Sequence, residues 1–194
     1  VLMDGLAAAE DTMYSRFAPE RGMMSWIFPQ GGGRVRTYVG FPFASDYVRL
    51  QGERDIARFI DTSVELGVPR ASYAQAAPAG PLATFDATDV WVEAPYAGGV
   101  VLIGDAAATS DPTWGQGMSL TLHDVRLLSD ALLATDDWDA AARAYCDQHD
   151  RDTSTIRAAD TWYTDIFLDI GPTADERRAR ALPHILQEPS RIPE

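Results

Sequence analysis

The chain has 194 residues, of which 46% are hydrophobic and 10% aromatic, a composition typical of a folded globular protein rather than a disordered one. Its 29 acidic residues outnumber its 16 basic ones, and the resulting net charge of −13 disfavours binding to nucleic acid or to anionic membranes. No apolar segment reaches the ~18 residues that a membrane helix needs. A single cysteine, Cys146, excludes an intramolecular disulfide, and no zinc-like cluster is visible, so we predict no metal site and a cytoplasmic location.

All basic residues are arginine, and lysine is absent. Arginine codons are GC-rich, so this bias and the abundance of alanine indicate a bacterial source with a GC-rich genome. The N-terminus lacks an initiator Met and the basic segment of a signal peptide. We therefore expect the sequence to be a processed or trimmed part of something longer.

Residues 22–42 have the pattern of a β-hairpin. Two runs rich in β-branched and aromatic residues flank Gly31–Gly33, whose glycines supply the positive φ that a tight turn requires. The second run alternates: one face carries Val35, Val39 and Phe41, and the other carries Arg34, Arg36 and Tyr38. We expect the first face to pack on a core and the second to face something polar.

The following segments alternate between helical and extended patterns. Residues 54–67 have apolar residues at helical spacing and end at a glycine, which predicts a helix, and 71–80 reads as a loop rich in Pro and Ala. Residues 88–93 predict a short strand. The continuous apolar run 100–103 is typical of a strand that is covered on both faces, although little else in the chain is suited to flank it.

The last part of the chain is predicted to be helical. Apolar residues from Met118 to Leu132 indicate a long amphipathic helix, residues 138–168 look helical throughout, and 174–186 predict a final short helix. His123 and His149 each precede an aspartate, but adjacent residues on a helix point apart. We therefore expect both to be surface histidines, and Cys146 to be a small buried residue.

The stretch from Val101 to Met118 carries the chemical signal. A strand is followed by Gly104 and Asp105, a loop, and a helix start with glycines at 115 and 117. Ligands of α/β sheets bind beyond the carboxyl ends of strands, and a carboxylate accepts hydrogen bonds from sugar or polyol hydroxyls. Free backbone N–H groups at a helix N-terminus favour partial negative charge. These features suit the ribityl chain and the ring of a flavin.

This stretch resembles the second flavin motif of the FAD-dependent aromatic hydroxylases and related monooxygenases with the p-hydroxybenzoate hydroxylase fold. The matching residues are Gly104, Asp105, Ala106, Ala107, Pro112, Gly115, Gln116, Gly117 and Asp124, whereas Ala108 and Ser119 replace the family's common His and Asn. The hairpin also resembles the family's substrate-domain sheet. The family's N-terminal Gly-x-Gly-x-x-Gly unit, which binds the ADP half of FAD, is absent.

The resemblance implies an α+β fold in two portions. Residues 1–98 correspond to an antiparallel substrate-domain sheet with a helix, and 99–194 to the C-terminal strand and helices of an FAD-binding α/β domain without its N-terminal Rossmann unit. It assigns cofactor binding to Gly104, Asp105, Pro112, Gly115, Gln116 and Gly117. Asp105 would hold the ribityl chain, while the Pro loop and the Gly-Gln-Gly backbone would border the isoalloxazine. Asp4-Gly5 lacks the residues that accompany the family's Asp-Gly motif, and we interpret it as a turn.

The resemblance further implies a C-terminal fragment of an FAD-dependent monooxygenase that uses NAD(P)H as reductant and acts on a small organic substrate. Arg36 and Tyr38 are candidates to line the substrate cavity, with solvent exposure as the alternative, and Trp114 either lines the ring or only packs. Such a chain would need the missing N-terminal FAD-binding segment to retain FAD, and an unfilled sheet edge would invite oligomerisation. A flavin-dependent reductase or dehydrogenase of the same superfamily, or a fragment without activity, are the alternatives; a halogenase would need a lysine.

Overall fold

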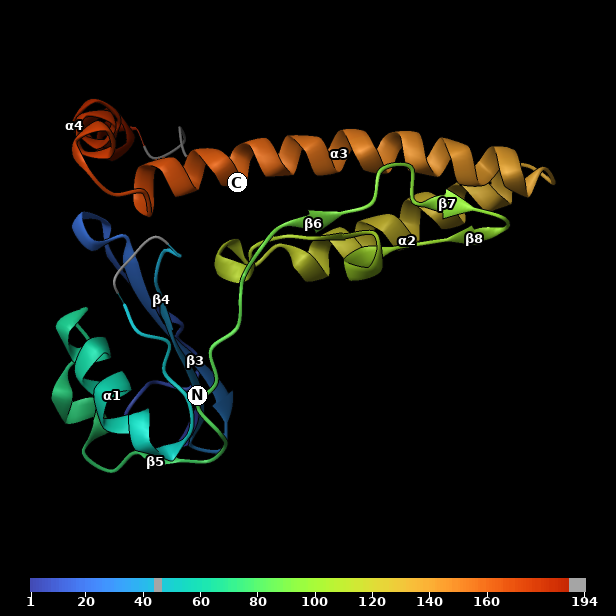
Figure 1. Ribbon diagram of the computed structural model, residues 1–194. Coiled ribbons are helices and arrows are strands. Elements are labelled where there is room, and N and C mark those ends of the chain that lie inside the picture. The colour runs from blue at the N-terminus through green and yellow to red at the C-terminus, as the bar shows by residue number, and fades with distance from the viewer. Residues whose placement is uncertain (44–46, 189–194) are drawn as a thin grey trace. The chain divides into compact units, whose positions relative to one another are not determined.

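The computed structural model describes residues 1–43 and 47–188, and it has the predicted mixed α+β architecture (Figure 1). By its internal contacts the chain divides into two compact units. Unit 1 comprises Val1–Phe85 and Tyr163–Glu194, and unit 2 comprises Asp86–Trp162. The assignment of residues 1–98 and 99–194 to two domains of the family stays a prediction.

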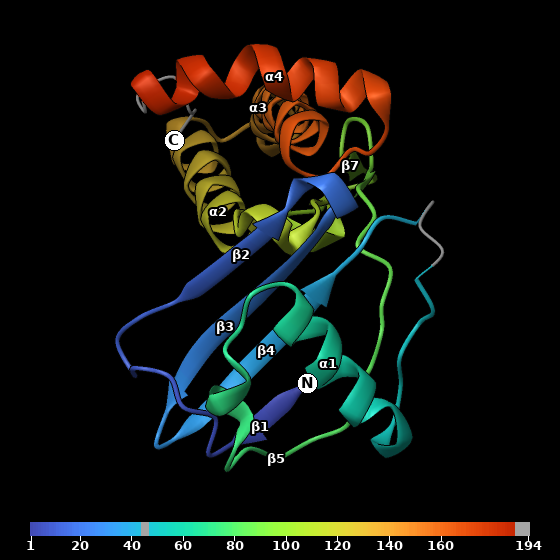
Figure 2. The ribbon, with the colours of Figure 1, turned by 90° about the vertical axis from the view of Figure 1, so that its left-hand side faces the viewer.

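Unit 1 is built on an antiparallel five-stranded sheet with the strand order β2-β3-β4-β1-β5 (Figure 2). The strands are β1 (Leu2–Asp4), β2 (Tyr14–Ala18), β3 (Met23–Gly31), β4 (Arg34–Gly40) and β5 (Ala77–Pro78). Strands β3 and β4 confirm the predicted hairpin, and all three glycines of its turn have positive φ. Asp4 ends β1 instead of forming a turn, and Gly5 after it has φ +72°.

Helix α1 (Ile56–Glu65) follows the 3-10 turn η2 (Glu53–Asp55), confirms the predicted helix, and lies against one face of the sheet (Figure 2). The core between them consists of Val1, Met3, Leu6, Ile27, Val35, Leu50, Phe59, Val68, Tyr73 and Leu82. Within this apolar core the hydroxyl of Ser63 contacts Ser25 Oγ at 3.1 Å and accepts a hydrogen bond from Tyr73 at 2.7 Å. The hydroxyl groups of Ser25, Ser63 and Tyr73 therefore each have a partner inside the core.

The opposite face of the sheet carries aromatic residues beside the predicted polar side chains. In the pairing of β3 with β4, Trp26 lies opposite Tyr38 and Phe28 lies opposite Arg36, so these four residues share one face. The rings of Phe28 and Tyr38 meet edge to face with centroids 5.8 Å apart. The alternation of β4 is thus confirmed: Val35 and Thr37 are buried, while Arg36 is exposed.

Further elements complete unit 1. The predicted loop at 71–80 includes most of the 3-10 turn η3 (Arg70–Tyr73) and the strand β5. Strand β5 pairs with β1 and forms one edge of the sheet. The turn η1 (Pro19–Arg21) precedes β3. Helix α4 (Pro172–Gln187) extends the predicted final helix, and its buried Arg178 donates to the backbone oxygen of Asp169 at 2.7 Å.

Unit 2 consists of two long helices and several two-residue strands. Its elements are β6 (Val90–Trp91), β7 (Tyr96–Ala97), β8 (Val100–Val101), η4 (Gly104–Ala106), β9 (Ala108–Thr109), η5 (Pro112–Trp114), α2 (Gly117–Ala134) and α3 (Trp138–Phe167), whose last turn belongs to unit 1. Strand β6 pairs with β9, and β7 pairs with β8. The predicted long helices are confirmed, and the predicted strand at 88–93 is reduced to β6.

The prediction of a strand at 100–103 covered on both faces is wrong. Strand β8 contains two residues and pairs only with β7, and the Val100 side chain is 62% exposed. Gly98 and Gly99, with φ +56° and +82°, form the tight turn between the two strands. The apolar run favours burial, but no described strand flanks β8 on its other side.

Candidate functional site

The Gly104–Asp105 turn lies at the end of the extended segment that follows β8. Gly104 is buried with φ +55°, and a Cβ on it would lie 2.6 Å from Thr121 Oγ1 of α2. Glycine is therefore required at 104 both for its backbone conformation and for its close packing on α2. The carboxylate of the next residue, Asp105, is exposed.

The turn lies beside the start of helix α2. A carboxylate oxygen of Asp105 is 4.0 Å from the position that a Cβ on Gly117 would occupy. Gly117 is the first residue of α2, and the N–H groups of the first turn of a helix have no acceptor within the helix. A carboxylate that accepts and N–H groups that donate thus lie next to each other.

The Pro112 loop connects the turn to this helix start. Asp111 caps η5 by accepting a hydrogen bond from the Thr113 N–H at 2.8 Å. The loop ends at Gly115, which has φ +72° and donates to the Pro112 carbonyl at 3.1 Å. Pro112 and Gly115 are exposed, whereas Gln116 is partly buried and its Oε1 has no hydrogen-bond partner among the described residues.

Unit 2 therefore brings together six predicted cofactor residues and Trp114. The six are Gly104, Asp105, Pro112, Gly115, Gln116 and Gly117, and they lie on η4, η5 and the start of α2. The other two predicted substrate residues, Arg36 and Tyr38, lie in unit 1 on the sheet face opposite α1. The roles of all nine residues stay predictions.

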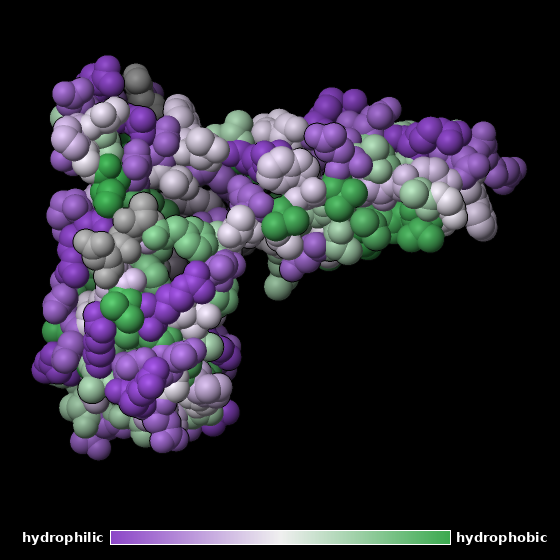
Figure 3. Space-filling view, in the orientation of Figure 1, coloured by the Kyte–Doolittle hydropathy of each residue, from purple (hydrophilic) through white to green (hydrophobic). Residues whose placement is uncertain are grey.

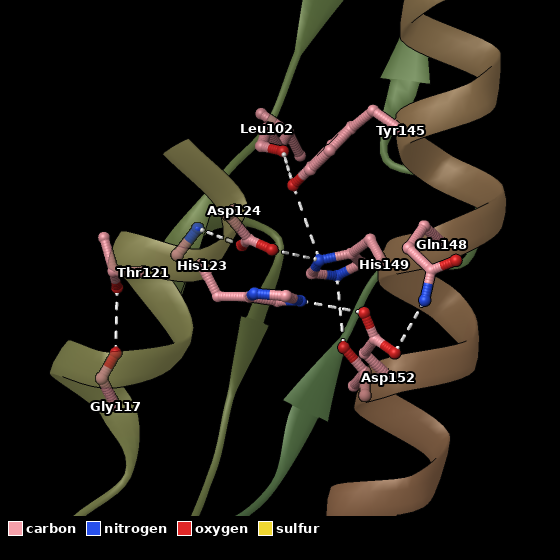
Figure 4. A network of polar contacts seen from close by, with 11 residues as sticks. Leu102, Gly117, Thr121, His123, Asp124, Tyr145, Gln148, His149 and Asp152 are labelled. Atoms are coloured by element: carbon pink, nitrogen blue, oxygen red, sulfur yellow. Dashed lines mark hydrogen bonds and ion pairs between the residues drawn. The ribbon is translucent and has the colours of Figure 1, made fainter. Parts of the chain in front are cut away.

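Sequence reasoning missed a buried polar network behind the turn (Figure 4). Asp124 of α2 is 4% exposed and accepts a hydrogen bond from the Gly104 N–H through Oδ2 at 2.9 Å. Its Oδ1 lies 2.9 Å from Nδ1 of His149 on α3. The hydroxyl of Tyr145, also on α3, donates to the Leu102 carbonyl at 3.0 Å. The network thus joins both long helices to the turn.

The prediction that His149 is a surface residue is wrong, because only 4% of it is exposed. Adjacent residues on one helix do point apart, but Asp124 lies on α2 and His149 on α3, and the packing of the two helices brings their side chains together. A signal was present in the sequence: Asp124 lies one turn after Thr121 and before Leu128, on the side of α2 that packs inward. A carboxylate at such a position needs a partner.

A second His–Asp pair joins the same helices nearer the surface. His123 Nε2 lies 2.9 Å from Asp152 Oδ2, and Gln148 donates to the other oxygen of Asp152 at 2.8 Å. Burial opposes ionisation of Asp152, but these hydrogen bonds outweigh it and lower the pKa of the carboxyl. A cavity of about 20 Å³ lies between the two pairs and is lined by Gly104, Ser110 and Gly117, among others.

Asp160 of α3 is a buried carboxylate near the Pro112 loop. It is 4% exposed, and neither of its oxygens has a hydrogen-bond partner within residues 1–43 and 47–188. Burial, together with the charges of Asp89 and Asp111, raises its pKa to about 6. Asp89 Oδ1 itself accepts a hydrogen bond from the Asp111 N–H at 2.9 Å.

The described residues hold neither a cluster of metal ligands nor a membrane-spanning helix. Within residues 1–43 and 47–188, no group of three or more His, Cys, Asp or Glu side chains could hold a metal ion. Over that range no helix combines the length and the apolar character needed to cross a lipid bilayer.

Solved structures with a similar fold are flavoproteins. A flavin-dependent brominase, Bmp2, matches 84% of this chain and 43% of its own length with 21% identity and a TM-score of 0.65. PqsL of Pseudomonas aeruginosa, a probable FAD-dependent monooxygenase, matches 87% of this chain and 48% of its own length with 17% identity and a TM-score of 0.57. HpxO of Klebsiella pneumoniae, solved with FAD, matches 96% of this chain and 52% of its own length with 20% identity and a TM-score of 0.50. The chain thus spans about half the length of these proteins, and no curated protein sequence matches it.

The fold is that of the FAD-dependent monooxygenases, which confirms the resemblance seen in the flavin motif. The family model for squalene epoxidase matches residues 39–149, more than half of the chain. The chain belongs to the squalene epoxidase family.

Proposed function

We propose that the Gly104–Asp105 turn and the start of α2 hold the ribityl and ring portions of FAD in an FAD-dependent monooxygenase. The observation that carries this proposal is the juxtaposition of the Asp105 carboxylate with Gly117, the first residue of α2. The donor set fits a flavin, because a polyol needs an acceptor and the pyrimidine edge of the ring needs donors. The glycines leave the approach open: a Cβ on Gly115 would meet nothing within 4 Å.

Each residue would contribute a distinct action. Asp105 would accept hydrogen bonds from ribityl hydroxyls, and the N–H groups of the first turn of α2 would stabilise negative charge at the ring edge. The capped turn η5 holds Pro112 in an exposed position from which it would border the ring. The side-chain oxygen of Gln116, which has no partner in the part of the chain that the structure describes, would accept a hydrogen bond from a donor on the ligand.

When bound, reduced FAD supplies the electrons for activation of O2, and NAD(P)H would serve as the reductant. The substrate would be a small organic molecule; its candidate contacts are Arg36 and Tyr38 in unit 1 and, separately, Trp114 in unit 2. Since the chain has no lysine, a cationic side chain that this chain offers to the substrate would be an arginine, and Arg36 is the first candidate.

We further propose that the ADP half of FAD is bound by a polypeptide segment outside residues 1–194. The solved flavoproteins are about twice as long as the part of them that this chain matches. Unit 2 also exposes an apolar surface on α2 and β8 that suits a contact with further chain (Figure 3). On this proposal the isolated chain does not retain FAD, and the purified protein is colourless; a stably yellow protein would overturn it.

The central experiment compares Asp105→Ala with the parent in protein expressed from the complete reading frame. Loss of a charged acceptor should raise the Kd for FAD at least about tenfold in a fluorescence titration. Asp147→Ala, which removes an exposed carboxylate elsewhere in unit 2, is the matched control and should leave the Kd unchanged. Equal FAD retention by Asp105→Ala and the parent would sink the assignment.

A second experiment addresses the reaction. The holoenzyme should oxidise NAD(P)H faster in the presence of O2 and a substrate than without O2. Oxidation at the same rate with and without O2 would instead indicate a reductase. We also propose a cytoplasmic location, which the single cysteine favours and which cell fractionation tests.

A further inference from the structure

We propose that Asp124 and His149 position the Gly104–Asp105 turn for the flavin, acting through the Gly104 backbone N–H. The inference rests on the proposed function, because it concerns how that site is held in shape. Both side chains are 4% exposed and are linked to the turn through the Gly104 N–H, so both are positioning residues rather than catalytic ones.

The two carboxylate oxygens of Asp124 have different partners. Oδ2 accepts from the Gly104 N–H and Oδ1 faces His149 Nδ1, both at 2.9 Å. A carboxylate can only accept, so His149 Nδ1 carries a proton and donates to it. The other ring nitrogen lies 3.4 Å from the Thr153 hydroxyl. His149 thus fixes the rotation of the Asp124 carboxylate and with it the acceptor offered to Gly104.

Helix α3 also holds the segment before the turn at another point. Tyr145 donates to the Leu102 carbonyl at 3.0 Å, and its ring lies against that of His149 with centroids 5.5 Å apart. The peptide groups on both sides of Ile103 are therefore fixed by hydrogen bonds that lead back to α3. Because Gly104 has a left-handed backbone and glycine is permissive there, the external hydrogen bonds select its conformation.

The role of the pair in positioning is distinct from a role in stability. A buried hydrogen-bonded polar pair adds little net stability compared with apolar residues of similar size, because the cost of desolvation offsets the hydrogen bonds. A polar pair retained in the interior of unit 2 is better explained by the geometry that it imposes. Replacing both residues with leucine should therefore leave the chain folded while freeing the turn.

The test on the 194-residue chain is amide hydrogen exchange at Gly104, which needs no flavin. The double variant Asp124→Leu/His149→Leu should exchange this amide at least about tenfold faster than the parent, with an unchanged unfolding midpoint. Asp124→Asn should keep the protection, because the amide oxygen accepts from Gly104 and the NH2 group donates to a His149 reprotonated on Nε2. The matched control is Asp152→Ala, which removes the outer His–Asp pair. Parent-like protection in the double variant would overturn the inference.

The second readout is the Kd for FAD of protein expressed from the complete reading frame. We expect an increase of at least about tenfold in the double variant, a value within about threefold of the parent in Asp124→Asn, and no change in Asp152→Ala. If the double variant does not fold, Tyr145→Phe removes one hydroxyl and keeps the ring, and it should raise the Kd about threefold or more. An unchanged Kd in these variants, with Asp105→Ala weakened, would refute the positioning role. An unchanged Kd in Asp105→Ala as well would refute the proposed function, and the flavin part of this inference with it.

Discussion

The two units bury different kinds of residue. Unit 1 has a core of large aliphatic and aromatic side chains between α1 and the sheet. The buried hydrophobic residues of unit 2 are smaller on the whole, namely Ala107, Ala141, Ala142, Tyr145 and Cys146, and they lie beside the buried polar residues Asp124, His149 and Asp160. Meanwhile unit 2 exposes many of its large apolar residues, among them Val100, Met118, Leu122, Leu133 and Trp138.

This contrast indicates which unit can keep its fold without further contacts. Burial of large apolar side chains is the main stabilising contribution to folding, so unit 1 should hold its structure by itself. Unit 2 is organised by hydrogen bonds around the Gly104–Asp105 turn, and its strands contain two residues each. Its geometry is therefore specified by polar contacts, while its apolar surface remains available to another partner.

The largest expected effect comes from the core of unit 1. Phe59→Ala removes a side chain that is 3% exposed and should lower the free energy of unfolding by about 3–5 kcal/mol. Urea unfolding followed by the amide signals of β3 and β4 measures this loss. Phe43→Ala, at a phenylalanine of the same unit that is 67% exposed, should change stability by no more than about 0.5 kcal/mol. Similar losses in both variants would contradict an apolar core between α1 and the sheet.

The next effect tests whether the turn in unit 2 is tightly packed. Gly104→Ala introduces a Cβ 2.6 Å from Thr121 Oγ1, in addition to the cost of a left-handed backbone. Gly98→Ala is the matched control, because Gly98 has nearly the same φ, +56° against +55°, and an open environment. Thermal unfolding should show Gly104→Ala to be less stable than Gly98→Ala by about 1–3 kcal/mol. Equal stabilities would mean that the turn is loosely held.

Local sequence patterns predicted the parts of the chain whose cause is local. The hairpin at 22–42 follows from alternation and three glycines, and the helices follow from apolar spacing and stop signals. The flavin motif was found because its residues are close in sequence, from Gly104 to Gly117, and the fold comparison supports the family that it indicates.

The rest could not be predicted because its cause lies between distant segments. Asp124 and His149 are 25 residues apart, and only the packing of α2 on α3 makes them partners. The run at 100–103 is apolar, yet apolar character states a preference for burial and does not supply the covering residues. Val100 is exposed because β8 pairs with β7 alone among the described strands.

A smaller effect depends on pH and concerns Asp160. Its pKa in the folded chain, about 6, lies above that of an unfolded aspartate, so the folded state binds the proton more tightly. Folding therefore loses stability as the pH rises from about 4 to above 6, where the buried carboxylate must ionise. Asp160→Asn should be about 1–2 kcal/mol more stable than the parent near pH 8 and equal to it near pH 4 in chemical denaturation. The exposed substitution Asp147→Asn should give no such divergence; a divergence there would point to net charge as the cause.

The smallest effect on stability is expected at the apolar surface of α2. Its size distinguishes a surface for contacts with other molecules from part of an internal core. Leu122 is 63% exposed and Leu133 87%, so Leu122→Ser or Leu133→Ser removes little buried area and should change the free energy of unfolding by no more than about 0.5 kcal/mol. The same variants should reduce self-association of the isolated chain in sedimentation experiments, because exposed apolar patches promote contacts between molecules. A loss of stability as large as that of Phe59→Ala would show that these leucines belong to an internal core. The contrast between the two units would then fail, since unit 2 would also be held together by large apolar side chains.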